Sequence, residues 1–261
     1  MSYSMAEHEK IIVSFLQFIN KNSNDFILKG GTALKQCYNL NRFSEDIDFD
    51  VKNKANLIDF VQLYCDKNHF SFRVGKNTDT VQRCFINYDT NEKPLKIEAS
   101  YRNRIISNDD IKSINSITVY SINRLAQMKA NAYASRDKIR DLYDLSFICN
   151  HFYSNLSSQT INILSDAVGN KGIEQFDYLL STQYDPLIDK DKLASDFLSM
   201  NEKLGLLYSN EERNNCTDKT KIILEKNMLE YKKENKESVS LKPKKQNNVI
   251  FNNKNGYNDG M

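Results

Sequence analysis

Two short segments decide the fold, LKGGTAL at residues 28–34 and RFSEDIDF at residues 42–49. The first continues the apolar run from Phe26, and its two glycines interrupt that run before residues of helical character begin. This order predicts a strand, a tight turn and the start of a helix. The second segment passes into alternating carboxylate and apolar residues as far as Val51, and a period of two predicts a half-buried strand.

The alternation places Asp46, Asp48 and Asp50 on one face of this strand, because successive side chains point to opposite faces. Same-face neighbours are about 6.6 Å apart, so their carboxylates repel by roughly 2 to 3 kcal/mol at an effective dielectric near 20. A bound Mg²⁺ reverses that repulsion, since hard cations prefer carboxylate oxygens. An exposed strand with an acidic outer face is the plainer interpretation of an isolated Asp-x-Asp.

Gly30, Gly31 and Thr32 are candidates for binding phosphate. Glycine allows close approach of the backbone, and the N-terminus of the helix that follows favours an anion. A strand-to-helix turn without a ligand is the alternative interpretation.

A further predicted strand at residues 95–102 carries Lys96 and Glu98 on one face, opposite Leu95 and Ile97. Glu98 is therefore a candidate third carboxylate. The alternative is a surface residue paired with Lys96 or Arg102.

A third candidate stretch holds Lys129, Arg136, Arg140, Asp141 and Asp144. Arg136 and Arg140 stand four residues apart, as do Arg140 and Asp144, so each pair shares a side if the stretch is helical. Ordinary ion pairs on a helix surface are the alternative interpretation.

The remaining periodicities divide the chain into a mixed α/β half and a helical half. Helices are expected at 4–21, where Ser4 and Glu7 form a capping-box pair, and from 57 to 64. Strands are expected at 70–75 and 82–88. Helical spacing continues at 121–135, 137–151, 158–168, 190–208 and 218–237. The predicted fold class is α+β, with a mixed sheet flanked by helices at 1–118, a helical bundle at 119–237 and a mobile Lys- and Asn-rich tail at 238–261.

Composition excludes several classes of protein. The five cysteines form no Cys-x-x-Cys pair and only three histidines accompany them, which argues against a zinc site or a disulfide framework and for a reduced, cytoplasmic protein. No apolar run approaches the roughly 18 residues that span a bilayer, so no membrane association is expected. The net charge of +2 depends on residues 231–261, where seven Lys face three acidic residues. RNA binding would therefore need a local basic patch or the tail.

The two opening segments closely resemble the first motif of the AbiEii/AbiGii-type nucleotidyltransferase toxins, within the polymerase-β-like superfamily. Lys96-Ile97-Glu98 resembles the region of the family's third acidic residue, and the stretch from Lys129 to Leu145 resembles its downstream motifs. The likeness covers roughly residues 26–147. It implies a nucleotidyltransferase domain, a helical domain that shapes the acceptor cleft, a cognate antitoxin and, as in some members, transfer of nucleotides to the 3′ end of tRNA.

The resemblance also implies roles for individual residues. Asp46 and Asp48 would hold one or two Mg²⁺, with Glu98 beside the attacking hydroxyl, although the family more commonly has Asp at that position. Lys129 would contact the triphosphate or the leaving group of the NTP substrate. The expected substrate-binding residues are Gly30, Gly31, Thr32, Arg42, Ser44, Lys96, Arg136, Arg140, Asp141 and Asp144. Modification of a protein hydroxyl, or a non-catalytic module that binds RNA or a partner protein, are the competing functions.

Overall fold

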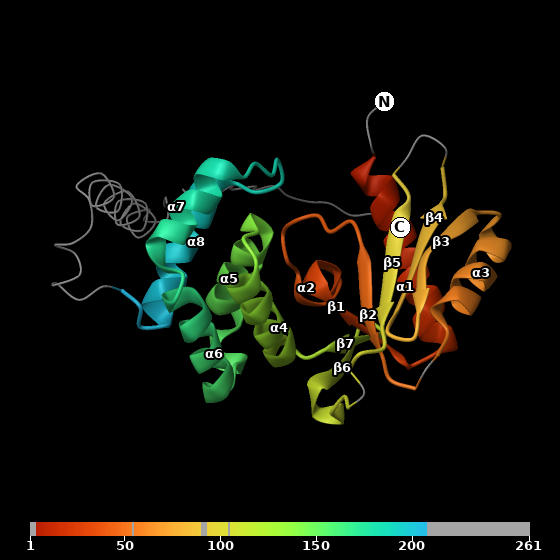
Figure 1. Ribbon diagram of the computed structural model, residues 1–261, viewed down its shortest axis with the longest axis horizontal. Helices are drawn as coiled ribbons and strands as arrows, with labels where there is room; N and C mark the ends of the chain where they lie inside the picture. Colours follow the sequence, from red (N-terminus) through yellow and green to blue (C-terminus); the bar gives the residue numbers. More distant parts are fainter. Residues whose placement is uncertain (1–3, 54, 90–92, 104, 208–261) are drawn as a thin grey trace, which may run out of the picture. The chain divides into compact units, whose positions relative to one another are not determined.

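A seven-stranded mixed sheet organises the N-terminal half of the computed structural model, which describes residues 4–53, 55–89, 93–103 and 105–207 (Figure 1). The strand order is β3-β4-β5-β2-β1-β7-β6, in which β2 runs parallel to β5 and β1 parallel to β7. The strands are β1 (Phe26–Lys29), β2 (Ile47–Val51), β3 (Ser71–Thr78), β4 (Val81–Asn87), β5 (Leu95–Ser100), β6 (Ile111–Ile114) and β7 (Ile117–Tyr120).

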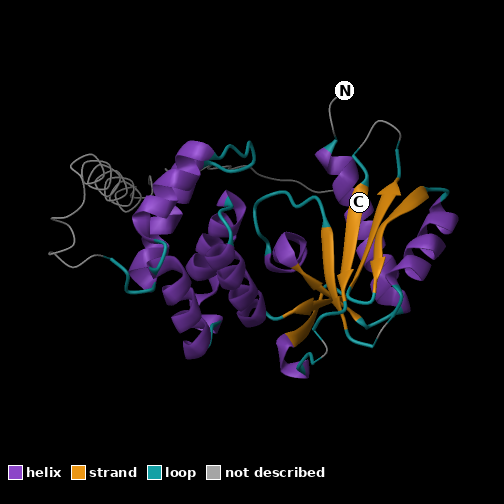
Figure 2. Cartoon of the chain, viewed as in Figure 1, coloured by secondary structure: helices purple, strands orange, loops and turns teal. Residues whose placement is uncertain are grey.

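One face of the sheet is apolar and lies under α1 (Met5–Asn22) and α3 (Leu57–Asn68) (Figure 2). Phe26 in β1 packs edge-on against Phe60 of α3, and Phe15 of α1 packs in the same manner against Tyr64. Alternation in β2 and β5 directs fully buried apolar residues to this face, so their polar neighbours must face the other way. The alternation seen in the sequence therefore positions the candidate site.

The opposite face meets α2 (Gly30–Tyr38), which begins directly after β1, and the chain then continues into helices. Ser121 caps α4 immediately after β7, by accepting a hydrogen bond from the Arg124 amide. The helices are α4 (Ile122–Ser135), α5 (Ile139–Phe152), α6 (Ser158–Gly169), α7 (Gly172–Thr182) and α8 (Lys190–Lys203), with short 3₁₀ turns at Asn108–Asp110 and Tyr153–Asn155. The chain as far as Leu207 is one compact unit.

The predicted α+β class is confirmed, and so are the helices and strands expected as far as residue 102, to within a few residues at their ends. Two features of the sequence were missed. The strands of the hairpin β6–β7 were not expected, although the sheet does end at Tyr120, close to the predicted boundary. The turn residues Asn115 and Ser116 both have positive φ, as a type I′ hairpin turn requires. Helix α7 was also missed, although Ile173, Phe176 and Leu179 form its buried stripe.

The helix expected at 190–208 ends earlier, at Lys203, because the chain turns at Gly205 with a φ of +69°. The helix expected at 218–237 and the tail expected at 238–261 lie outside the described residues. None of the helices in the described part of the chain is both long enough and apolar enough to cross a membrane.

Candidate active site

Four charged side chains form one row across the polar face of the sheet. The strand register sets Lys29 of β1 opposite Asp48 of β2, Asp48 opposite Glu98 of β5, and Glu98 opposite Arg83 of β4. Directly opposed residues project to the same face. The row therefore reads positive, negative, negative, positive, and its two carboxylates lie side by side in the middle.

Two of the carboxylates at this site accept hydrogen bonds from cationic side chains. Lys96 Nζ donates to Asp46 Oδ2 at 2.6 Å, and Arg83 Nε donates to Glu98 Oε2 at 2.7 Å. Burial raises the pKa of Asp48, and the charges of Asp46 and Glu98 raise it further while Lys96 opposes them. Burial alone would lower the pKa of Lys96, but its hydrogen bond to Asp46 and the surrounding carboxylates raise it. Burial and the neighbouring carboxylates thus outweigh the cations at Asp48.

Both glycines of the first motif leave room for functional groups. Gly30 has a φ of +79°, and a Cβ on it would lie 3.1 Å from Asp48 Oδ2. A Cβ on Gly31 would lie 2.8 Å from the guanidinium of Arg42 and 2.9 Å from Ser44 Oγ. The two glycines were expected to form a tight turn, but α2 begins directly at Gly30. The unpaired N–H groups of the first helical turn therefore begin beside the Asp48 carboxylate.

The backbone around Asp46 is fixed from two sides. The Thr32 hydroxyl donates to the Asp46 carbonyl and lies 2.9 Å from Ser44 Oγ. On the other side the buried His8 ring has Nε2 2.8 Å from the Glu45 carbonyl. Thr32 is itself buried, so its side chain fastens the loop, and only its backbone remains suited to phosphate. Sequence reasoning missed His8, because nothing near it in the chain marks a contact 37 residues away.

A buried ion-pair network joins the loop before β2 to α4 and α5. Arg42 Nε and one terminal nitrogen donate to the two carboxylate oxygens of Asp144, each at 2.7 Å. Lys129 Nζ lies 2.5 Å from Asp144 and 3.4 Å from Asp141. Burial would raise the pKa of Asp144, but the charges of Lys129 and Arg42 lower it below its ordinary value. Asp144 is completely buried, so it positions Arg42 and Lys129 instead of reaching a ligand.

Arg136 and Arg140 do not share one helix face, so the four-residue spacing argument was wrong for this pair. It holds for Arg140 and Asp144, which both lie in α5. Arg136 is the extended C-cap residue of α4, whereas Arg140 belongs to the first turn of α5. Arg136 Nε donates to Asp141 at 2.7 Å. Arg140 does not pair with Asp144 but with Asp185 in the loop after α7, and it lies 3.8 Å from Glu45. The local sequence pattern could not predict the contact between Arg140 and Asp185, because these residues are 45 positions apart.

Two expectations about the acidic strand faces also need correction. Asp50 does not join the open acidic face: only 3% of it is exposed, and it accepts hydrogen bonds from Lys29 and, at 2.8 Å, from the Tyr120 hydroxyl of the unforeseen strand β7. Glu98 pairs neither with Lys96 nor with Arg102. Its partner is Arg83, because the β4–β5 register opposes these two residues.

The donor set fits a hard cation at two carboxylates. Within the described ranges no three His, Cys, Asp or Glu side chains are grouped to hold a metal ion, and Arg83 engages the third candidate, Glu98. Mg²⁺ characteristically takes one or two protein carboxylates and completes its shell with water and substrate phosphate. Asp46 and Asp48, beside the N-terminus of α2, would meet that requirement once Lys96 releases Asp46.

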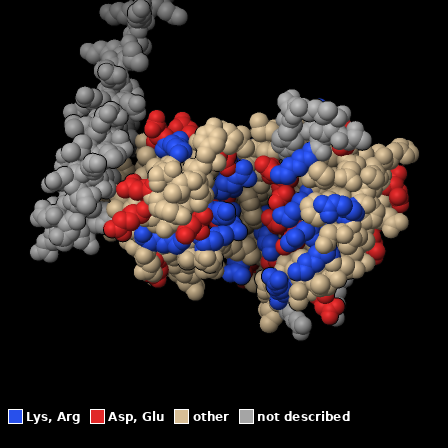
Figure 3. Space-filling model, turned by 45° about the horizontal axis from the view of Figure 1, so that its top comes forward, with Lys and Arg blue, Asp and Glu red and all other residues tan. Residues whose placement is uncertain are grey.

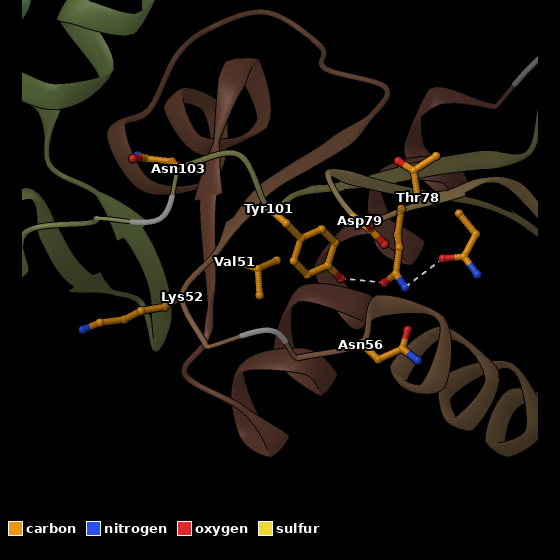
Figure 4. A pocket seen from close by; sticks show the side chains of 9 residues that line it. Val51, Lys52, Asn56, Thr78, Asp79, Tyr101 and Asn103 are labelled. Carbon is orange, nitrogen blue, oxygen red and sulfur yellow. Dashed lines mark hydrogen bonds between the residues drawn. The ribbon is translucent and has the colours of Figure 1, made fainter.

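A pocket of about 820 Å³ lies away from the candidate site, next to the C-terminal ends of β2 and β5 (Figure 4). Its walls are mainly amide and hydroxyl side chains, and within it the Tyr101 hydroxyl donates to Gln82 at 2.5 Å. None of the candidate residues lines it. The buried Cys84 takes no part in either place and packs in the core, as expected.

Comparisons with known proteins agree with this geometry. The chain is 28% identical to JHP933 from Helicobacter pylori, whose crystal structure matches with a TM-score of 0.64 over 78% of this chain and 95% of that one. A second H. pylori structure, of a proposed nucleotidyltransferase, matches with the same identity and TM-score over 79% and 97%.

An uncharacterised protein of Aquifex aeolicus (strain VF5) is 30% identical over 132 residues, which make up 48% of this chain and 58% of that protein. The family model described as "Nucleotidyl transferase AbiEii toxin, Type IV TA system" matches residues 18–211. The resemblance inferred from the motifs is thereby confirmed, and the chain belongs to the AbiEii nucleotidyltransferase toxin family of type IV toxin–antitoxin systems.

Proposed function

We propose that this nucleotidyltransferase transfers a nucleoside monophosphate from an NTP to a hydroxyl at the 3′ end of an RNA, with tRNA as the acceptor. It would act as the toxin of a toxin–antitoxin or abortive infection system, and a cognate antitoxin would counteract it. The observation that carries the proposal is the adjacency of Asp46, Asp48 and Glu98 to the N-terminus of α2 at Gly30. Carboxylates for a cation and backbone donors for phosphate thus occupy one place.

Mg²⁺ at Asp46 and Asp48 would neutralise charge on the triphosphate and lower the pKa of the acceptor hydroxyl. The backbone N–H groups of Gly31 and Thr32 bind the β and γ phosphates, since a helix N-terminus favours anions. Glu98, directly opposite Asp48, serves the acceptor hydroxyl once Arg83 releases it.

The remaining candidates divide into two groups. Lys96 exchanges its carboxylate partner for a phosphate oxygen, and Lys129 supplies a point charge to the triphosphate. Arg136 and Arg140, with side chains 58% and 39% exposed, contact acceptor phosphates. The positioning residues are the buried Arg42, Asp141 and Asp144 and the partly exposed Ser44. Figure 3 supports an anionic substrate, because Lys and Arg side chains gather on both sides of a hollowed region of the surface with acidic side chains close by.

The decisive experiment incubates the protein with Mg²⁺, each labelled NTP and total tRNA, beside an Asp46→Ala/Asp48→Ala variant. The native protein should label RNA at least about a thousandfold faster than the variant, because the variant has lost the cation-binding charge. Asp59→Ala/Asp66→Ala is the matched control, since it removes two aspartates from α3 on the other face of the sheet. Label on protein, detected by intact mass, or no transfer to any acceptor would refute the RNA proposal.

Lys129→Ala tests the contact with the triphosphate. Turnover should fall on the order of a hundredfold as stabilisation of transition-state charge is lost. Rates are compared below the unfolding temperature of both proteins, because Lys129 also belongs to the buried network. An unchanged rate removes Lys129 from the site.

A further inference from the structure

Figure 1 shows the loop that connects α7 and α8. Tyr184 in this loop presents its ring to solvent, although the residues on both sides of it are anchored. Tyr184 is 83% exposed, whereas its neighbour Asp185 is 8% exposed. An aromatic side chain left in water gives up the free energy that burial would contribute. The ring is therefore accessible to a partner, which would gain free energy by covering it.

The loop is fixed by its neighbours. Gln183 accepts a hydrogen bond from the Ile139 amide at 3.0 Å and donates to the Asp137 carbonyl at 2.7 Å, at the junction between α4 and α5. Asp185 pairs with Arg140 and also accepts from the Leu187 amide at 3.0 Å. The ring of Tyr184 is therefore displayed from a backbone that is already ordered, which lowers the entropic cost of binding.

Arg140 connects the loop that carries Tyr184 to the candidate active site. Arg140, which holds Asp185, also lies 3.8 Å from Glu45, the residue before Asp46. Arg140 is 39% exposed in its side chain, and the exposed Lys138 stands two residues earlier, where Gln183 is attached. The residues on both sides of Tyr184 are thus bound to the segment that carries Lys138 and Arg140. An exposed aromatic ring on a surface that also carries cations is the combination that binds single-stranded nucleic acid, since bases stack on the ring and cations track the phosphates.

We propose that Tyr184 is a stacking platform for a nucleobase of a single-stranded RNA acceptor, with Arg140 and Lys138 contacting the adjoining phosphates. The inference rests on the proposed function and adds a recognition site outside the carboxylate cluster. A nucleobase of the donor NTP is the other source of the same chemistry. A one-sided ring suits the acceptor better, because a small ligand needs walls that bury most of its surface, whereas neighbouring bases of a strand cover each other.

The chain contains no Trp, so Tyr184→Trp creates a single fluorescent reporter. This variant is titrated with a 12-nucleotide single-stranded RNA, with the same sequence as a duplex, and with each NTP, all without divalent metal so that no transfer occurs. Single-stranded RNA should quench the emission, while duplex and NTP should not. Tyr178→Trp, at a half-exposed tyrosine in α7, is the matched control and should show no quenching.

Kinetics supply the second arm. Tyr184→Ala should raise the KM for RNA about tenfold, within the range for loss of one stacked base, and leave the KM for NTP unchanged. Tyr184→Phe should restore the native value, because it keeps the ring, and Tyr178→Ala should match the native protein.

The outcomes separate the two proposals. Quenching by NTP alone would assign the ring to the donor base, and an absence of quenching by any nucleotide would show that the ring stacks on no base. Either result overturns the inference. An unchanged KM for RNA in Tyr184→Ala, with transfer intact, overturns it and leaves the proposed function standing. Quenching by single-stranded RNA without transfer by the native protein supports the platform and refutes the enzymatic acceptor.

Discussion

Asp48 on the sheet face and Asp144 in α5 are aspartates whose surroundings displace their pKa values in opposite directions. Burial and the neighbouring carboxylates raise the pKa of Asp48, although Lys96 acts against them. Burial is also the largest influence on Asp144, yet Lys129 and the two-pronged contact of Arg42 outweigh it and lower the pKa. The negative charge of Asp48 is only partly balanced by nearby cations, whereas that of Asp144 is balanced by Lys129 and Arg42.

The difference distinguishes a carboxylate kept for a ligand from one that holds the fold together. A charge that remains poorly compensated inside the protein costs stability, and a cation that binds there recovers that cost. A charge with two cationic partners leaves nothing for a ligand to add. The contrast between Asp48 and Asp144 therefore supports the proposal of a cation site at Asp48 and not at Asp144.

The largest expected effect on folding is that of Asp144→Asn. The change leaves the buried Arg42 without its counter-charge and Lys129 with only the longer contact to Asp141. It should lower the free energy of unfolding by about 3 to 5 kcal/mol and the melting temperature by roughly 6 to 20 °C. Calorimetry measures both. Asp196→Asn, which removes an exposed ion pair with Lys192 in α8, is the control and should cost less than about 1 kcal/mol. If the two variants melt alike, the network does not hold the two halves together.

An intermediate effect of opposite sign is expected for Asp48→Asn. Because the pKa of Asp48 is raised on folding, the folded state binds the proton more tightly, and native stability is lost as the pH rises through the folded-state pKa. Removing the charge should stabilise the protein by about 1 to 3 kcal/mol at neutral pH and by less in acid. Denaturant unfolding at several pH values measures the trend.

Asp50→Asn is the matched control on the same strand and should destabilise the protein, because Lys29 and Tyr120 lose their buried partner. A stabilisation by Asp48→Asn that does not vary with pH would contradict the assignment of Asp48 as the under-compensated carboxylate.

The smallest effect on folding is expected for Arg136→Gln. The Arg136 side chain is 58% exposed, so loss of its pair with Asp141 should change the free energy of unfolding by less than about 1 kcal/mol. The KM for tRNA should nevertheless rise severalfold and depend less on salt, because one phosphate contact is lost. Thermal melts and transfer assays at two salt concentrations test both statements, and an unchanged salt dependence would remove Arg136 from the acceptor surface.

Periodicity within a single strand or helix was enough to predict much of the site. The alternation in 46–51 and 95–100 set Asp46, Asp48 and Glu98 on polar faces, and the glycine pair marked the start of α2. The same motifs identified the family, which the match over residues 18–211 confirms. These features are local, because side-chain direction follows from backbone geometry over a few residues.

Contacts between distant segments were beyond this reasoning, as Asp50 illustrates. Its alternation matched that of Asp48, but β7, about 70 residues later, supplies Tyr120 and closes over it. Arg83 likewise faces Glu98 through the register of β4 and β5, and Arg140 finds Asp185 rather than its helical neighbour. Only packing decides such pairs.

The sequence by itself determined which residues carry charge to the polar face and where a helix begins beside them. The tertiary structure alone decided which carboxylates are neutralised by Arg and Lys and which remain available, because the free energy of a buried charge depends on partners that folding brings from other strands and helices.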